Sequence, residues 1–75
     1  MPPLPVISGD DFMDAMRKIG WTTVRQKGSH RCMTKPGEIA TLSIPDDREL
    51  APGTLKKLLR DAGVTVEDLL RLLSQ

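Results

Sequence analysis

The sequence predicts a small α+β protein whose helices cover one face of a three-stranded antiparallel sheet. In the first and last thirds, apolar residues recur at spacings of three and four, which is typical of helices. The middle third is rich in β-branched residues and turn signals, which is typical of short strands. This order predicts a two-layer α-β-β-β-α-α arrangement. The 75 residues suffice for one core, so we expect a single domain over residues 1–75.

The first helix is expected over residues 9–19. Ser8 suits the N-cap position, and Asp11 three residues later forms a capping-box-like pair with it. Gly20 is a natural terminator, because helices commonly end on a glycine in the left-handed conformation. The apolar stripe consists of Phe12, Ala15, Met16 and Ile19.

Three strands are expected over residues 21–26, 30–34 and 39–44. Gly28-Ser29 separates the first two, and Lys35-Pro36-Gly37-Glu38 is a turn signal before the third. In the third strand, Leu42 and Ile44 alternate with polar residues. In the first two strands polar and apolar residues do not alternate cleanly, so the sequence does not show which side chains face the helices.

Two more helices are expected in the last third. Pro52 suits the first turn of one helix, and Gly63 suits its end. Thr65 is a good N-cap for the final helix, with Asp68 placed to complete a capping box. The apolar positions are Leu55, Leu58, Leu59 and Ala62 in the first of these helices, and Leu69, Leu70, Leu72 and Leu73 in the second.

The composition excludes several kinds of protein and site. One cysteine cannot form an internal disulfide, and one cysteine with one histidine is too few ligands for a structural zinc site. We therefore expect neither a metal nor a cofactor. No apolar run approaches the roughly 20 residues of a membrane span, and the N-terminal residues lack the features of a signal peptide. We expect a cytoplasmic protein with no membrane partner.

The charges are unevenly distributed, although 11 basic and 10 acidic residues nearly cancel. Residues 15–37 contain only basic charges, and such a stretch can create a local positive field that attracts an anionic partner. The same stretch is also compatible with an ordinary solvated surface. The basic residues in it are Arg17, Lys18, Arg25, Lys27, Arg31 and Lys35.

The candidate site lies in the segment Arg25-Gln26-Lys27-Gly28-Ser29-His30-Arg31. His30 is the only imidazole, and this group titrates near neutral pH, so it can take a proton from a ribose 2′-hydroxyl. Nearby cations and backbone N–H groups can bind phosphate oxygens. These are the parts of a metal-independent ribonuclease. The alternative is that His30 is an ordinary surface residue beside a common turn. The residues expected to bind RNA phosphates are Lys27, Gly28, Ser29, Arg25, Arg31 and Lys35.

Several blocks of the chain, in order, resemble the HicA family of toxin ribonucleases. The most specific block is Arg25-Gln26-Lys27-Gly28-Ser29-His30. Together these blocks cover nearly the whole chain, and their order is far more specific than any one of them. The other blocks are Leu4-Pro5-Val6-Ile7-Ser8-Gly9, Ile19-Gly20-Trp21, Leu42-Ser43-Ile44-Pro45, Leu50-Ala51-Pro52-Gly53-Thr54-Leu55 and Ala62-Gly63-Val64.

This resemblance implies a fold like that of double-stranded-RNA-binding domains, α-β-β-β-α with a short C-terminal helix. It also implies cleavage of RNA, chiefly mRNA, with His30 as the catalytic general acid/base, and a HicB-type antitoxin that covers the site. We expect a monomer when the protein is free and a hetero-oligomer with the antitoxin. The chain departs from many relatives by lacking a second imidazole after Pro45. The sequence therefore does not show which group acts with His30 in acid/base catalysis. The candidates are Lys27, Ser29, water and the substrate itself.

Three other functions remain open at this point. A non-catalytic module that binds double-stranded RNA would need the same cations but no proton transfer. The helices within residues 55–69 also resemble a helix-turn-helix, although the second helix begins with acidic residues. A structural partner protein would bind no nucleic acid. The leucines of the final helix suit either the core or an interface with the antitoxin.

Overall fold

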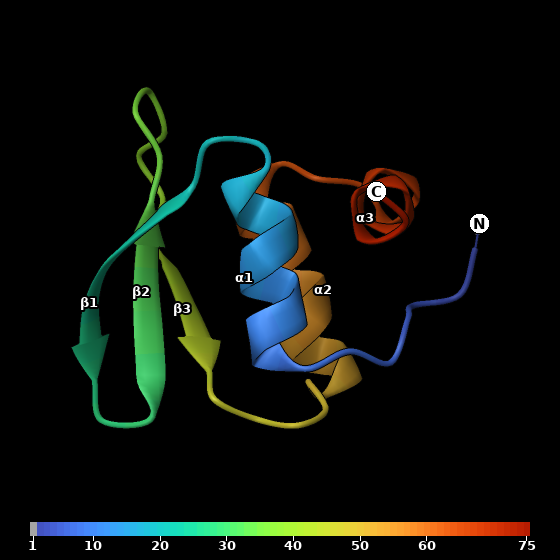
Figure 1. Ribbon diagram of the computed structural model, residues 1–75, viewed down its shortest axis with the longest axis horizontal. Helices are drawn as coiled ribbons and strands as arrows, with labels where there is room; N and C mark the ends of the chain where they lie inside the picture. The colour runs from blue at the N-terminus through green and yellow to red at the C-terminus, as the bar shows by residue number, and fades with distance from the viewer. Residues whose placement is uncertain (1) are drawn as a thin grey trace.

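The computed structural model describes residues 2–75 and confirms the α+β class. Met1, at the start of the expected domain, lies outside the described residues. The strands form one antiparallel sheet in the order β1-β2-β3. Both α1 and α2 contact β3, and α3 contacts α1 on the side away from the sheet (Figure 1). The elements are α1 (Gly9–Arg17), β1 (Thr22–Lys27), β2 (His30–Thr34), β3 (Leu42–Pro45), α2 (Pro52–Ala62) and α3 (Val66–Leu73).

Helix α1 begins as predicted and ends slightly earlier. The Ser8 hydroxyl accepts a hydrogen bond from the Asp11 backbone N–H at 3.0 Å. At the other end, the Gly20 N–H donates to the Arg17 carbonyl and the Trp21 N–H donates to the Met16 carbonyl. This pair of bonds, with Gly20 at a φ of 101°, is the Schellman pattern that closes a helix on glycine. The chain therefore turns out of the helix before residue 19.

Helices α2 and α3 follow the predicted capping pattern. Gly63 ends α2 at a φ of 70°, and the N–H groups of Gly63 and Val64 donate to carbonyls of the last turn. The Thr65 hydroxyl accepts from the Asp68 N–H, and the Asp68 carboxylate accepts from the Thr65 N–H, so the capping box before α3 is complete. Leu69 and Leu72 of α3 are buried, which confirms that this helix covers the core, whereas Leu70 remains 37% exposed.

The third strand is shorter than predicted, and the expected start at residue 39 is wrong. The last pair between β2 and β3 joins Met33 to Leu42, so residues 39–41 have no partner strand. The turn at Lys35 and Gly37 carries the chain away from the sheet, and Ile39 is fully exposed there. The strand also extends one residue further than predicted, because Pro45 pairs with His30.

Helix α1 and the end of β3 approach each other closely. A Cβ on Gly9 would lie 2.2 Å from the Pro45 carbonyl oxygen, so only glycine fits there. The Gly9 N–H also donates to the Asp47 carbonyl at 3.0 Å. This contact fixes the end of the sheet that carries the candidate site.

The core between the sheet and the helices is largely aliphatic. Its largest fully buried side chains are Trp21, Phe12, Met16, Met33, Leu42, Ile44, Leu55 and Leu69. Among the residues that the structure describes, none of the helices has the length and hydropathy needed to span a membrane.

Candidate functional site

The turn between β1 and β2 places His30 at the end of the sheet. Gly28 and Ser29 form a two-residue loop between the paired residues Lys27 and His30. Gly28 has a φ of 61°, which a primed hairpin turn requires at its first central position. A Cβ there would meet nothing within 4 Å, so the backbone conformation, and not the available space, calls for glycine.

The turn is held in place by its carbonyl groups. The Ser29 carbonyl accepts from the Asp46 N–H at 2.8 Å, which ties the turn to the end of β3. The Gln26 side chain donates to the Gly28 carbonyl at 3.1 Å. Within residues 2–75, the N–H groups of Gly28 and Ser29 have no acceptor. These two N–H groups are therefore free to donate to a bound anion.

A β-bulge determines which way the cations of β1 point. Trp21 is buried in the core, so strict alternation from it would turn Arg25 and Lys27 toward the helices as well. The register shifts between Thr23 and Arg25, which leaves Val24 as the extra residue. Beyond this bulge, Arg25 is opposite Cys32 and Lys27 is opposite His30.

His30, Arg25 and Lys27 consequently share one face of the sheet. Residues opposite each other in an antiparallel pair lie on the same face, and Met33 and Ile44 mark the face that is buried against the helices. His30 is three positions before Met33 in the same strand, so the two side chains point to opposite faces. His30 therefore lies on the face that the helices do not cover, which we call the open face. By register, the open face carries Thr22, Arg25, Lys27, His30, Cys32, Thr34, Ser43 and Pro45.

His30 is exposed and available to a ligand. Within residues 2–75 its ring has no hydrogen-bond partner. Its directly opposite neighbour, Lys27, has its Cβ about 5 Å away, as is usual for such pairs. Both side chains can therefore reach one phosphodiester. Arg25 lies two residues further along the same face, or about 7 Å along the strand, which suits a neighbouring phosphate.

Three of the six cations in residues 15–37, Arg17, Lys18 and Arg31, have their charges engaged within the protein. Arg17 pairs with Asp14 at 2.6 Å, and the Lys18 ammonium donates to the Leu72 carbonyl at 2.6 Å, at the end of α3. Arg31 also forms ion pairs, and the stem of Lys35 lies beside Gly20. In the described part of the chain, Arg25, Lys27 and Lys35 form no ion pair and no side-chain hydrogen bond. Their charges remain available to a partner.

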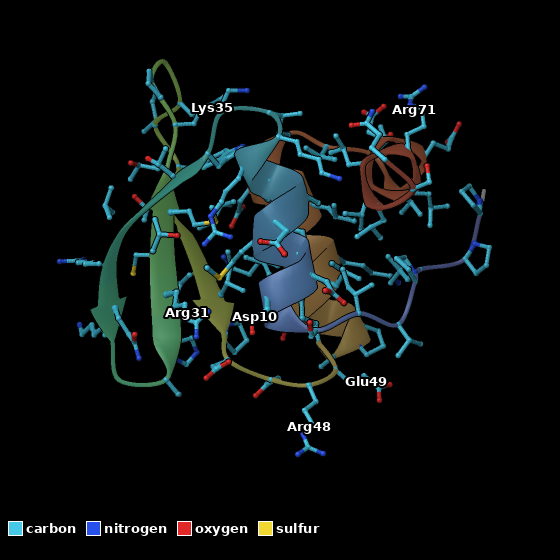
Figure 2. All side chains as sticks on the ribbon, viewed as in Figure 1. Asp10, Arg31, Lys35, Arg48, Glu49 and Arg71 are labelled. Atoms are coloured by element: carbon cyan, nitrogen blue, oxygen red, sulfur yellow. The ribbon has the colours of Figure 1, made fainter. Side chains whose placement is uncertain are left out.

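Arg31 faces the helices, unlike its neighbour His30. Its guanidinium contacts the Asp10 carboxylate of α1 at 2.5 Å and the Asp46 carboxylate after β3 at 3.8 Å. Figure 2 shows Arg31 and Asp10 meeting between β2 and α1. The charge of Arg31 is thus partly neutralised, and its side chain links β2 to α1 and to the loop after β3.

Lys35 lies at the opposite end of the strands from the turn (Figure 2). It is five positions after His30 in the chain, or about 16 Å along an extended strand. The structure therefore gathers His30, Lys27, Arg25 and the Gly28-Ser29 turn at one place. It does not bring Arg31 or Lys35 to them, and phosphate binding by these two residues stays a prediction.

Two exposed polar residues near the site were not singled out from the sequence. Ser43 lies on the open face of β3, diagonal to His30, and the alternation of Leu42, Ser43 and Ile44 is the signal that identifies it. Arg48 lies in the loop from β3 to α2, at the same end of the sheet as the turn (Figure 2). Its place at that end of the sheet follows from the fold and has no signal in the sequence.

A second group of cations, Lys56, Lys57 and Arg60, lies on α2, in the helix layer on the side of the sheet away from His30. Lys57 pairs with Asp61 at 2.8 Å, and this hydrogen bond holds the pKa of Asp61 below its ordinary value. The first turn of α3 carries Glu67 and Asp68, which repel a nucleic-acid backbone. The α2–α3 pair therefore offers a poorer surface for the backbone of a nucleic acid than the open face does.

Comparison with known proteins agrees with the resemblance noted above. The family model for the HicA toxin of bacterial toxin–antitoxin systems matches residues 9–64, from the first residue of α1 to the residue after the Gly63 cap. A search of curated proteins gave no match. The matched range includes the bulge, the turn and His30.

Proposed function

The chain belongs to the HicA toxin family of bacterial toxin–antitoxin systems, and from this membership we propose that it is a ribonuclease that cleaves mRNA without a metal ion. Its partners are then RNA and a HicB-type antitoxin, which covers the open face. We propose one domain that is monomeric when free, forms a hetero-oligomer with the antitoxin, and acts in the cytoplasm.

In the proposed reaction, His30 is the general base. Its neutral imidazole takes the proton of a ribose 2′-hydroxyl, and the 2′ oxygen forms a bond to the adjacent phosphorus. The bond from phosphorus to the 5′ oxygen then breaks, and this oxygen leaves with a proton from Lys27, Ser29, water or the substrate itself. The products are a 2′,3′-cyclic phosphate and a 5′-hydroxyl. Proton transfer by a positioned group typically contributes about 10²–10⁴-fold to a rate.

The charge that develops on the phosphate meets three groups of the turn. Lys27 is opposite His30 in the strand pair, and the free N–H groups of Gly28 and Ser29 lie in the turn that joins the two strands. Donors that are already in place before the reaction stabilise such a charge without reorganising. Arg25 would hold the next phosphate along β1.

One observation carries this proposal. The only imidazole of the chain is exposed on the open face, without an intramolecular partner, directly opposite a lysine that is also unpaired within residues 2–75. Exposure rules out an imidazole enclosed in the core, and the position of His30 opposite the unpaired Lys27 favours a phosphate site over an ordinary surface residue.

The test compares the wild-type protein with His30→Ala on a single-stranded RNA, with a metal chelator present throughout. We expect the wild type to cleave the RNA and to leave 2′,3′-cyclic phosphate ends, and the variant to be about 10²–10⁴-fold slower. Circular dichroism and RNA binding should be the same for both proteins, because His30 is exposed and unpaired.

Two results would contradict the proposal. Cleavage by His30→Ala at the wild-type rate would remove His30 from the reaction, and cleavage that requires added magnesium would exclude the metal-free scheme. RNA binding by both proteins without any cleavage would instead support a non-catalytic RNA-binding module.

A further inference from the structure

We propose that Arg48 binds an RNA phosphate on the side of His30 opposite to Arg25 and Lys27, so that the RNA crosses the strands at the turn end of the sheet. This inference rests on the proposed function and adds the path of the substrate. Arg48 lies outside the strands and outside the segment that the sequence singled out.

The strand order leaves one side of His30 without an available cation in the sheet. His30 lies in the central strand, and the available cations Arg25 and Lys27 both lie on β1. On the other side, β3 consists of Leu42, Ser43, Ile44 and Pro45 and carries no cation. An RNA strand that crosses the sheet therefore meets available cations in the strands only on the β1 side of His30. On the β3 side, it meets none until it reaches the loop after β3. Arg48 is the first cation of that loop.

The loop that carries Arg48 is held in a defined position next to the turn. On one side of Arg48, the Asp46 N–H donates to the Ser29 carbonyl at 2.8 Å, and the Asp47 carbonyl accepts from Gly9. On the other side, the N–H of the buried Leu50 donates to the Ile7 carbonyl at 2.8 Å. Because both flanks are bonded to other elements, the position of Arg48 relative to the turn is set before RNA binds.

The side chain of Arg48 is also available. It is exposed, projects outward from the loop (Figure 2), and forms no ion pair within the described residues 2–75. A free guanidinium binds phosphate with two parallel hydrogen bonds.

The neighbouring acids reduce this positive charge but do not cancel it. The Asp46 carboxylate already faces Arg31, at 3.8 Å. Asp47 and Glu49 are exposed beside Arg48, and neither forms an ion pair with it. They oppose phosphate binding at this loop, so neutralising Glu49 should have the opposite effect to neutralising Arg48.

The experiment measures binding of a single-stranded RNA in the His30→Ala background, where the proposed function predicts no cleavage. The variants are Arg48→Gln, Glu49→Gln and, as a control for lost charge away from the site, Lys56→Gln on α2. We expect Arg48→Gln to weaken binding and to reduce the slope of log affinity against log salt by about 0.7, the value for one phosphate contact on a single strand. Glu49→Gln should strengthen binding, and Lys56→Gln should leave the slope unchanged.

A second measurement locates the contact. RNAs that each carry one neutral methylphosphonate linkage are bound to the Arg48→Gln and Lys27→Gln variants. In each variant, one methylphosphonate linkage should no longer weaken binding, because the side chain that contacts this phosphate is missing. This linkage should lie on one side of the cleavage position for Arg48→Gln and on the other side for Lys27→Gln. An unchanged salt slope for Arg48→Gln, or the same linkage for both variants, would overturn the inference. Failure of the wild-type protein to cleave RNA would overturn the proposed function, whatever the effect of Arg48.

Discussion

Among the individual residues, the cations of residues 15–37 differ in what they contact. Arg17, Lys18 and Arg31 hold carboxylates or the end of a helix, so their charges serve the fold. Arg25 and Lys27 form no ion pair within the described chain and share a face with His30. The basic stretch therefore contains both cations that hold the fold together and cations that remain available to a partner.

Because the charge of Lys27 is not engaged within the described chain, its removal should affect RNA binding. In the His30→Ala background, Lys27→Gln should weaken binding of RNAs of different sequence to a similar extent, because a phosphate contact carries no base information. The salt slope should fall by about 0.7. Binding measured over a range of salt concentrations checks this, with Lys56→Gln as the control. An unchanged slope for Lys27→Gln would remove Lys27 from the phosphate site.

At the level of the elements, Arg31 joins β2 to α1 and to the end of β3. The neighbouring His30 faces the opposite way because successive residues of a strand point to opposite faces. One short strand thus places a cation in an internal ion pair and an imidazole on the open face. The sequence Gly28-Ser29-His30-Arg31 does not show this difference, because it depends on which face the helices cover.

The close contact of α1 with β3 predicts that Gly9→Ala lowers the stability of the fold. The new Cβ would lie 2.2 Å from the Pro45 carbonyl oxygen, and a backbone atom cannot move aside as a side chain does. We expect a loss of about 1–3 kcal/mol in the free energy of unfolding, the usual range for overpacking. Denaturant unfolding measures this loss.

Gly53→Ala is the matched control for this substitution. Gly53 lies in the first turn of α2, and a Cβ there would meet nothing within 4 Å. We expect this variant to be as stable as the wild type or more stable by up to about 1 kcal/mol, since alanine favours a helix over glycine. Equal losses for the two substitutions would show that the contact between Gly9 and Pro45 does not limit stability.

The capping box of α3 predicts a dependence of stability on pH. Hydrogen bonds from Thr65 to the Asp68 carboxylate, with a further contribution from Arg71, lower the pKa of Asp68 below its ordinary value of 3.8. A carboxyl group whose pKa is lower in the folded state stabilises the fold above its unfolded pKa, and this contribution is lost as the pH falls through the folded pKa. Asp68→Asn should therefore be less stable than the wild type near neutral pH, and the difference should shrink below about pH 4.

Thermal unfolding of both proteins at neutral and acidic pH measures this difference. A gap in Tm between Asp68→Asn and the wild type that stays constant down to acidic pH would show that the ionised carboxylate does not stabilise α3. Glu67→Gln, one position earlier in the same turn, is a control for the general effect of removing an acidic charge.

For the whole molecule, the candidate site depends on contacts between segments that are distant in the sequence. The turn at Gly28-Ser29 is bonded to Asp46, the loop after β3 is bonded to Gly9, and Arg31 reaches Asp10. The helices cover one side of the sheet (Figure 1), and by register His30 lies on the other side. The RNA path that we propose, from β1 across β2 to Arg48, rests on this arrangement.

The order of the elements, their caps and the segment that holds His30 follow from the sequence, because apolar periodicity and capping residues act within a few residues of chain. The start of β3, the faces of Arg25, Lys27 and Arg31, and the place of Arg48 follow only from the fold. They depend on the bulge at Val24, on the pairing of Met33 with Leu42, and on hydrogen bonds between remote loops. Such contacts arise only when the core closes, and a one-residue shift in pairing turns every later side chain to the other face.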